Sequence, residues 1–134
     1  MAQTLCQLEK KGGSFGGSET SLWSNSNPTS NYGYATITLN QSIESFKYVK
    51  IKYYNNTASL VELSVLASVE DIKKTYVASG CNMATVEPYS NAYFVRAYGF
   101  ISGTSVFIGN AIYVDSPSSA TPSHLIPIGI YGVN

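Results

Sequence analysis

The residues that could support catalysis in this chain are few, and their spacing matches no catalytic motif. The one histidine, His124, follows Thr-Pro-Ser and precedes an apolar stretch, so we expect it to begin a strand or to lie at an interface. No Gly-x-Ser-x-Gly motif presents a serine as a nucleophile. Glycoside hydrolysis needs two carboxylates a few ångström apart, and the candidates are Glu62, Glu70, Asp71 and Glu87. They fall on polar strand faces or in loops, so we expect solvated surface charges and predict no enzyme.

The spacing of the cysteines and acids also predicts no metal and no cofactor. Cys6 and Cys81 are far apart and form no Cys-x-x-Cys pair, and no Asp/Asn/Gly loop has the ligand spacing that calcium needs. We expect two buried thiols; a disulfide that joins the N-terminal segment to the body of the domain is the alternative. The Gly-rich segment 10–20 gives backbone freedom, but no strand–turn–helix pattern follows to make it a phosphate-binding loop.

Composition and charge exclude several classes of partner. Of the 134 residues 12% are charged, about half the usual share, and eight Lys and Arg balance eight Asp and Glu. We therefore predict no basic surface for nucleic acid, and no run of about 20 apolar residues is available for membrane insertion. The first residues show neither the basic start nor the apolar stretch of a secretory signal peptide.

Aromatic residues offer a binding chemistry that needs no charge. The chain has eleven Tyr, five Phe and one Trp beside many Ser, Thr and Asn residues, a mixture that suits sugar binding. Aromatic faces stack on the CH groups of a sugar, while hydroxyls and amides bond its hydroxyl groups. The candidate ligand-binding residues are the aromatics expected in loops: Trp23, Tyr32, Tyr34 and Tyr89. For Trp23 we favour an anchor that pins the turn at Asn27-Pro28 to the core, and ligand contact is the alternative.

Strands must position these residues, because apolar residues alternate with period two and no helix is predicted. The predicted strands are 34–40, 46–54, 59–67, 72–78, 91–103, 104–114 and 124–134, with a short one at 1–8. Residues 80–90 should form a loop with room for a short strand, and 115–123 a loop. Strands 46–54 and 59–67 should pair as a hairpin. The side chains that we expect the hairpin to bury are Val49, Ile51, Tyr53, Val61, Leu63 and Val65.

Strands 91–103 and 104–114, which meet at a turn at Ser102-Gly103, are apolar on both faces. The predicted faces are Tyr93, Val95 and Ala97 against Phe94, Tyr98 and Phe100, then Val106, Ile108 and Ile112 against Phe107 and Tyr113. Such strands are covered on both sides. One cover is the core; for the other we favour a neighbouring subunit over a second layer of the same chain. The predicted fold is therefore an all-β antiparallel sandwich, jelly-roll-like and trimeric, over 20–134, after an N-terminal strand and Gly-rich linker at 1–19.

Two segments of the chain resemble the distal domains of phage tail appendage proteins. The segment LWSNSNPTSNYGYATITL is similar to a pattern that begins Leu-Trp-Thr-Asn-x-x-Pro, and the C-terminal segment is similar to Ile-Pro-x-x-Ile-Tyr-Gly-Ile. The matching residues are Leu22, Trp23, Asn25, Pro28, Thr36, Leu39, Ile126, Pro127, Ile130, Tyr131 and Gly132. Ser24 and Val133 depart from the pattern, and Tyr32 or Tyr34 stands in place of a Phe.

The resemblance implies a homotrimeric domain at the tip of a virion appendage, which faces outward, binds host cell-surface polysaccharide and joins other tail or capsid proteins. It names no binding residues, so the four aromatic candidates rest on the sequence alone. Because the Trp of the pattern recurs with the turn, the resemblance favours the anchor role for Trp23. Two alternatives stay open: a structural head-fibre or decoration protein without a ligand, and a stand-alone bacterial carbohydrate-binding module.

Overall fold

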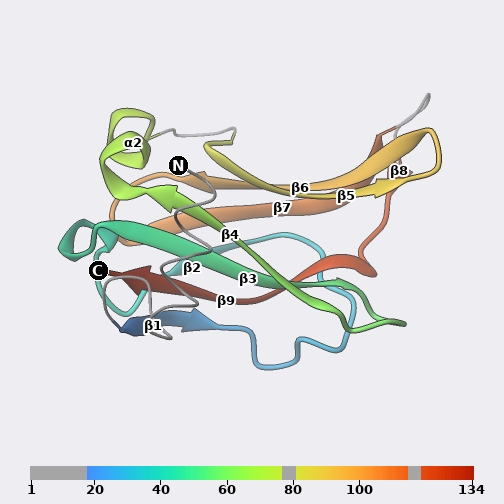
Figure 1. Ribbon diagram of the computed structural model, residues 1–134, viewed down its shortest axis with the longest axis horizontal. Helices are drawn as coiled ribbons and strands as arrows, with labels where there is room; N and C mark the ends of the chain where they lie inside the picture. The colour runs from blue at the N-terminus through green and yellow to red at the C-terminus, as the bar shows by residue number, and fades with distance from the viewer. Residues whose placement is uncertain (1–17, 77–80, 115–118) are drawn as a thin grey trace, which may run out of the picture.

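The computed structural model describes residues 18–76, 81–114 and 119–134, which form two antiparallel sheets packed as layers (Figure 1). Sheet I has the order β1-β9-β3-β4, with β1 at Glu19–Ser24, β9 at His124–Val133, β3 at Tyr48–Asn56 and β4 at Glu62–Ser68. Sheet II has the order β2-β7-β6-β5, with β2 at Ala35–Thr38, β7 at Ser105–Val114, β6 at Ala92–Phe100 and β5 at Met83–Tyr89; β8, Ser119–Ala120, pairs with β7. The predicted β-sandwich is confirmed, whereas the strand expected at 1–8 lies outside the described residues.

The core fills the space between the sheets with alternate side chains from both. Its fully buried members include Leu22, Val49, Ile51 and Ile130 from sheet I and Tyr98, Phe100, Val106 and Ile108 from sheet II. The inward alternation predicted for 46–54 is confirmed, because β3 is paired on both sides, with β4 and with β9. A shift of one residue in either pairing would move the apolar side chains of β3 to the solvent face. The period-two pattern of β3 therefore predicts which of its side chains are buried.

The hairpin of β3 and β4 is confirmed, but part of the expected buried face of β4 is exposed. Val61 is 48% exposed and Leu63 is 42% exposed. Of the three side chains predicted to be buried here, only Val65 packs against the core. The reason is that β4 is the edge strand of sheet I, and Figure 1 shows its turn end pointing away from sheet II. Alternation in a sequence identifies a face but not whether another layer covers it.

The expectation of an all-strand chain without a helix is wrong at two places. Residues Ile43–Ser45 form a 3-10 turn, η1, and Val69–Lys74 form a short α-helix, α2, where a strand was predicted over 72–78. Val69 and Ile72 are one helical turn apart, and both are buried. Two acids in the first turn of α2 and two lysines in its last turn complement the helix dipole. Among the described residues, neither helix is long and apolar enough to cross a membrane.

Residues predicted as loops contain further strands. The segment 80–90 holds the full-length strand β5, in which Met83 and Thr85 are buried and alternate residues face outward. Pro88 is tolerated because β5 is an edge strand, where a missing backbone N–H breaks no ladder. The segment 115–123 contains β8, and its residues 115–118 lie outside the description. The turn at Ser102-Gly103 is confirmed as the connection from β6 to β7.

The outward faces of the two sheets differ in charge. On sheet I, Glu19 lies 2.6 Å from the Lys50 ammonium and 3.0 Å from the Lys52 ammonium. The described strands of sheet II contain two charged residues, and both are on the inward face: Arg96 is fully buried, and Glu87 bonds His124 of sheet I. The described outward face of sheet II is therefore neutral.

Candidate ligand-binding site

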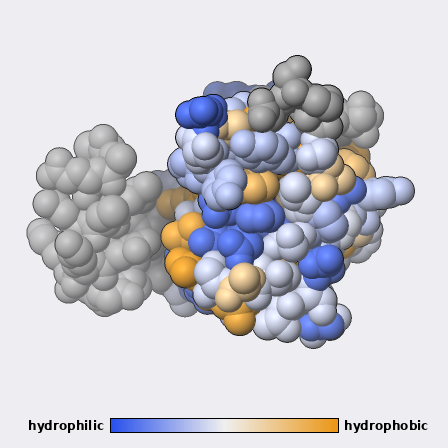
Figure 2. All heavy atoms as spheres, turned by 90° about the vertical axis from the view of Figure 1, so that its right-hand side faces the viewer, coloured by the Kyte–Doolittle hydropathy of each residue, from blue (hydrophilic) through white to orange (hydrophobic). Residues whose placement is uncertain are grey.

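One end of the sandwich holds an open pocket of about 500 Å³, which we call the aromatic pocket. Its lining residues are Tyr89, Phe94, Tyr113, Ser119, Ala120, Thr121, Pro122, Ser123 and His124. Figure 2 faces this end of the molecule and shows hydrophilic and hydrophobic side chains beside one another. The lining combines flat aromatic faces with hydroxyl groups, and its one titratable base is the imidazole of His124.

Three strands of sheet II supply the aromatic wall. Tyr89 ends β5, Phe94 lies in β6, and Tyr113 lies opposite Phe94 on β7. The ring centroids are 5.4 Å apart for Tyr89 and Phe94, 5.0 Å for Phe94 and Tyr113, and 6.2 Å for Tyr89 and Tyr113. The first two pairs are tilted and the third is edge-on, and all three separations lie in the range that aromatic pairs favour. Phe94 is buried and Tyr89 is 57% exposed, so Tyr89 presents the accessible ring.

A β-bulge in β7 brings Tyr113 to this wall. Tyr98 pairs with Ile108, but Arg96 pairs with Ala111, so β7 holds one extra residue between these pairs. The extra residue reverses the faces of β7 beyond it. Ala111 is therefore buried, and Tyr113 contacts Phe94. The predicted faces of 104–114 are right as far as Ile108 and wrong after it, where Ile112 and Tyr113 exchange sides.

Sheet I supplies the imidazole of the pocket. His124 begins β9, as the sequence predicts, and its ring stacks on Phe94 with centroids 3.7 Å apart and planes 9° apart. Its Nδ1 atom lies 3.2 Å from Oε1 of Glu87. The Glu87 side chain is 18% exposed, so the expectation of a solvated surface charge is wrong for this residue. Burial, followed by the negative charge of Glu87, raises the pKa of the nearby Tyr53.

Arg96 ties together the backbone next to the pocket from inside the core. Its Nε donates to the carbonyl of Leu125 at 2.8 Å, and its two terminal nitrogens donate to four further carbonyls at 2.7–3.0 Å. These four acceptors are the carbonyls of Tyr32, Gly33, Gly109 and His124. A guanidinium has five N–H donors, so every donor has a partner. Burial lowers the pKa of Arg96, but an arginine stays protonated in proteins.

The backbone at the start of β9 is strained, and the clamp by Arg96 offsets the strain. Leu125 has a φ of 53°, a left-handed conformation that few residues other than glycine adopt. The carbonyls of Leu125 and of its neighbour His124 are both acceptors for Arg96. The arginine therefore fixes the direction in which the His124 side chain leaves the backbone.

The hydroxyl rim of the pocket is the segment 119–123, which is fixed mainly through its backbone. The N–H of Thr121 donates to Ala111 at 2.7 Å, and the carbonyl of Pro122 accepts from Tyr32 at 2.9 Å. The buried hydroxyl of Thr121 has no hydrogen-bond partner among the described residues. The rim thus has a fixed backbone, and its two serines, Ser119 and Ser123, line the pocket and can bond a polar ligand.

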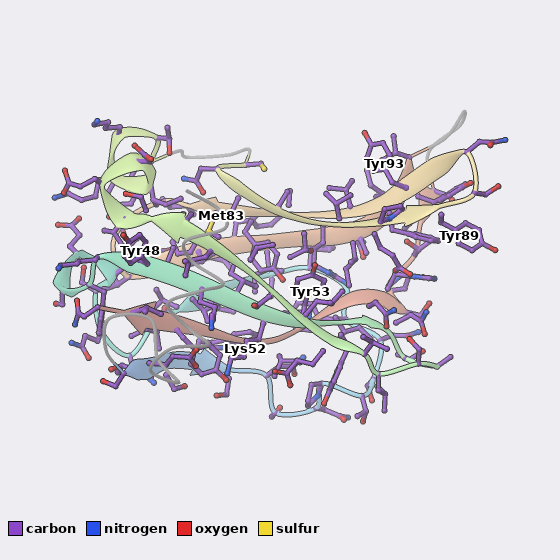
Figure 3. All side chains as sticks on the ribbon, in the orientation of Figure 1. Tyr48, Lys52, Tyr53, Met83, Tyr89 and Tyr93 are labelled. Carbon is purple, nitrogen blue, oxygen red and sulfur yellow. The ribbon has the colours of Figure 1, made fainter. Side chains whose placement is uncertain are left out.

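The structure separates the four aromatic residues predicted as ligand contacts. Tyr89 lines the pocket, and Figure 3 shows it at the end of the sandwich, whereas Tyr93 points away from sheet I. Trp23 is partly buried against the core and meets Tyr32 edge-on at 6.3 Å. Tyr34 is 70% exposed and lies 6.4 Å from Phe107. Only Tyr89 of the four is in the aromatic pocket.

Trp23 lies in strand β1 and not in a loop as expected, and the turn that follows it is tied to β9 through Asn25. The side-chain amide of Asn25 donates to the carbonyl of Pro127 at 2.7 Å, and the backbone N–H of Asn25 donates to Ile128. The side-chain oxygen of Asn25 accepts from the N–H of Asn27 at 2.9 Å. The turn is therefore tied to β9 through Asn25, and the turn-anchor role of Trp23 stays a prediction.

Sequence reasoning missed Phe94, Tyr113 and the pairing of Glu87 with His124 as site features, because these residues meet only through the register of sheet II and the contact between sheets.

Among the cysteines, Cys81 is an exposed free thiol, so the expectation of a buried thiol is wrong for it. Cys6 lies outside the described residues.

Comparisons of this chain with protein-family models, curated proteins and solved structures found no match.

Proposed function

We propose that this chain is a phage appendage domain that attaches to host cell-surface glycan through the aromatic pocket. The observation that carries the proposal is the combination of an exposed tyrosine ring, a second tyrosine and a hydroxyl rim in one open pocket. Sugar rings bring apolar CH faces and hydroxyl groups at once, and this lining offers a partner for each. The resemblance of the N- and C-terminal segments supplies the phage context.

The proposed mechanism is reversible binding without catalysis. Tyr89 stacks on one face of a sugar ring, Tyr113 borders the ring, and the hydroxyls of Ser119 and Ser123 bond its hydroxyl groups. A single open pocket of this kind binds weakly, and a homotrimer engaging several sugars on one surface raises the total affinity without any new contact. The neutral outward face of sheet II supports the trimer, because charged side chains are depleted at the centre of protein interfaces.

A pair of tyrosine variants tests the pocket. Tyr89→Ala removes the accessible ring, and we expect monovalent affinity for a glycan found on a printed array to fall about tenfold. Tyr34→Ala is the matched control, because Tyr34 is more exposed than Tyr89 but lies outside the pocket. Calorimetry with the soluble oligosaccharide measures both. Equal losses in the two variants, or a loss in Tyr34→Ala alone, would place the binding site elsewhere.

A structural head-fibre or decoration protein without a ligand is the second candidate. The observation that favours it is the apolar outward face of sheet II, where Val86 is 46% exposed and Tyr93 is 42% exposed. Light scattering after size exclusion separates the assemblies: a mass near three times 14.4 kDa agrees with a trimeric appendage. A monomer that binds glycan would instead favour a stand-alone carbohydrate-binding module.

A further inference from the structure

We infer that the aromatic pocket selects neutral sugars against sugars that carry a carboxylate, and that the Glu87–His124 pair sets this choice. The inference rests on the proposed glycan-binding function and names the chemical class of its ligand. Three features of the described residues carry it: the fixed ring of His124, the charge of Glu87 behind that ring, and the lack of a cation that a ligand carboxylate could reach.

The imidazole of His124 is held in one orientation. Phe94 stacks on its face, and Glu87 lies 3.2 Å from Nδ1. A carboxylate only accepts hydrogen bonds, so the neutral ring places its proton on Nδ1, where it donates to Glu87. The other ring nitrogen, Nε2, then carries a lone pair and acts as an acceptor. Because His124 lines the pocket, this acceptor favours a ligand that brings a proton to donate, as a sugar hydroxyl does.

The charge of Glu87 opposes an anionic ligand. The side chains of Glu87 and His124 are 18% and 21% exposed, so solvent screens this charge only in part. A ligand carboxylate beside His124 would meet a lone pair on Nε2 and the negative charge of Glu87 beyond the ring. Neither group can donate a hydrogen bond to the carboxylate while the imidazole is neutral.

No described cation compensates for this repulsion. The lining residues include no Lys and no Arg. Arg96 bonds the carbonyl of His124, but it is fully buried, and its five donors are bonded to backbone carbonyls. Lys52 is turned to the outward face of sheet I, where Glu19 pairs with it (Figure 3). A ligand carboxylate therefore finds no ion-pair partner among the described residues of the pocket.

The test uses pairs of oligosaccharides that differ only in a CH₂OH group and a carboxylate at the same carbon, printed on one array at about pH 8, more than one unit above the pKa of a free imidazole. We expect the wild-type protein to bind the neutral member at least about tenfold more tightly, the size of one like charge across a partly screened site. In Glu87→Gln the preference should shrink to less than about threefold, because binding of the neutral member weakens and binding of the carboxylated member strengthens. Glu70→Gln, on the surface of α2, removes a distant acid and should leave the wild-type preference in place.

The outcomes separate this inference from the proposed function. Equal binding of both members by the wild-type protein, or tighter binding of the carboxylated one, overturns the charge selection and leaves glycan attachment standing. An unchanged preference in a folded Glu87→Gln variant overturns the role of Glu87. Binding of neither member in any pair overturns glycan attachment and the inference with it. The wild-type preference decides the question of selectivity even where the variant does not fold.

Discussion

Replacing Arg96 with methionine should destabilise the domain more than any surface change, because this one side chain bonds backbone carbonyls from three separate parts of the chain. The acceptors are Tyr32 and Gly33 in the loop before β2, Gly109 in β7, and His124 and Leu125 at the start of β9. Methionine keeps much of the apolar stem, so the packing loss is small. The expected effect comes from the carbonyls that lose their donor.

The magnitude follows from how many of those carbonyls can find water. The two loop carbonyls can turn toward solvent, whereas the three in β7 and β9 are held by their strands. At about 1–1.5 kcal/mol for each of these three buried acceptors left without a donor, Arg96→Met should lower the free energy of unfolding by about 3–4.5 kcal/mol. Arg96→Lys keeps the charge and up to three donors, so we expect about half that loss. A domain of ordinary stability, about 5–15 kcal/mol, would still fold with either change.

Urea unfolding followed by tryptophan fluorescence measures both variants. Trp23 is the only tryptophan, and it contacts Tyr32, whose carbonyl is one of the acceptors. Lys74→Met is the control for loss of a positive charge, because Lys74 is exposed at the end of α2 and should change stability by less than about 0.5 kcal/mol. A loss below about 1 kcal/mol for Arg96→Met, with an unchanged dependence on urea, would refute the clamp.

Three further predictions concern the scaffold. Gly132→Ala should lower the free energy of unfolding by about 2 kcal/mol, because a Cβ there would overlap the ring of Phe46. Gly33→Ala has open space around it and should be nearly neutral, and thermal melts of the two variants measure both. Burial raises the pKa of Glu19, but hydrogen bonds from two lysines of β3 outweigh this and lower it overall. This carboxylate therefore contributes under about 1 kcal/mol of stability at neutral pH, and the contribution is lost as pH falls through its lowered pKa. In urea titrations, Glu19→Gln should lose less stability over the acid range than the wild-type protein does. Cys81 should react with a maleimide in the folded protein, and peptide mapping should place the label there; an unlabelled Cys81 would contradict its exposure.

The strands that could be predicted from the sequence are those that are paired on both edges and packed against the opposite sheet. Strand β3 is such a case, since its alternation of Val49, Ile51 and Tyr53 survives intact in the core. Strand β4 shows the limit, because an edge strand can keep an apolar alternation that no other layer covers. Helix α2 was missed because six residues offer only one apolar pair at helical spacing, Val69 and Ile72, next to a stretch that also alternates as a strand.

Less of the candidate site could be predicted, because it depends on register. Tyr89 could be proposed from the sequence as a binding aromatic, although in a loop and not at the end of β5, and His124 could be predicted as the first residue of a strand. The contact of Phe94 with Tyr113 depends on one extra residue in β7, and no local signal in the sequence marks it. The pairing of Glu87 with His124 joins two sheets and 37 positions of sequence. Such contacts arise from tertiary packing, which single-sequence patterns do not contain.

Arg96 connects the fold to the candidate site, because its backbone acceptors lie at irregular positions of the chain that shape the pocket. Gly109 belongs to the bulge that turns Tyr113 toward Phe94, and Leu125 has the left-handed backbone that follows His124. The terminal nitrogen that donates to the carbonyl of His124 also donates to the carbonyl of Tyr32, whose N–H donates to Pro122 in the hydroxyl rim. A regular sandwich would need neither the bulge nor the left-handed residue, and each of these two leaves a carbonyl turned inward that only a buried donor can satisfy. The buried arginine therefore stabilises the end of the sandwich that contains the pocket, and loss of Arg96 should disturb ligand binding even in variants that remain folded.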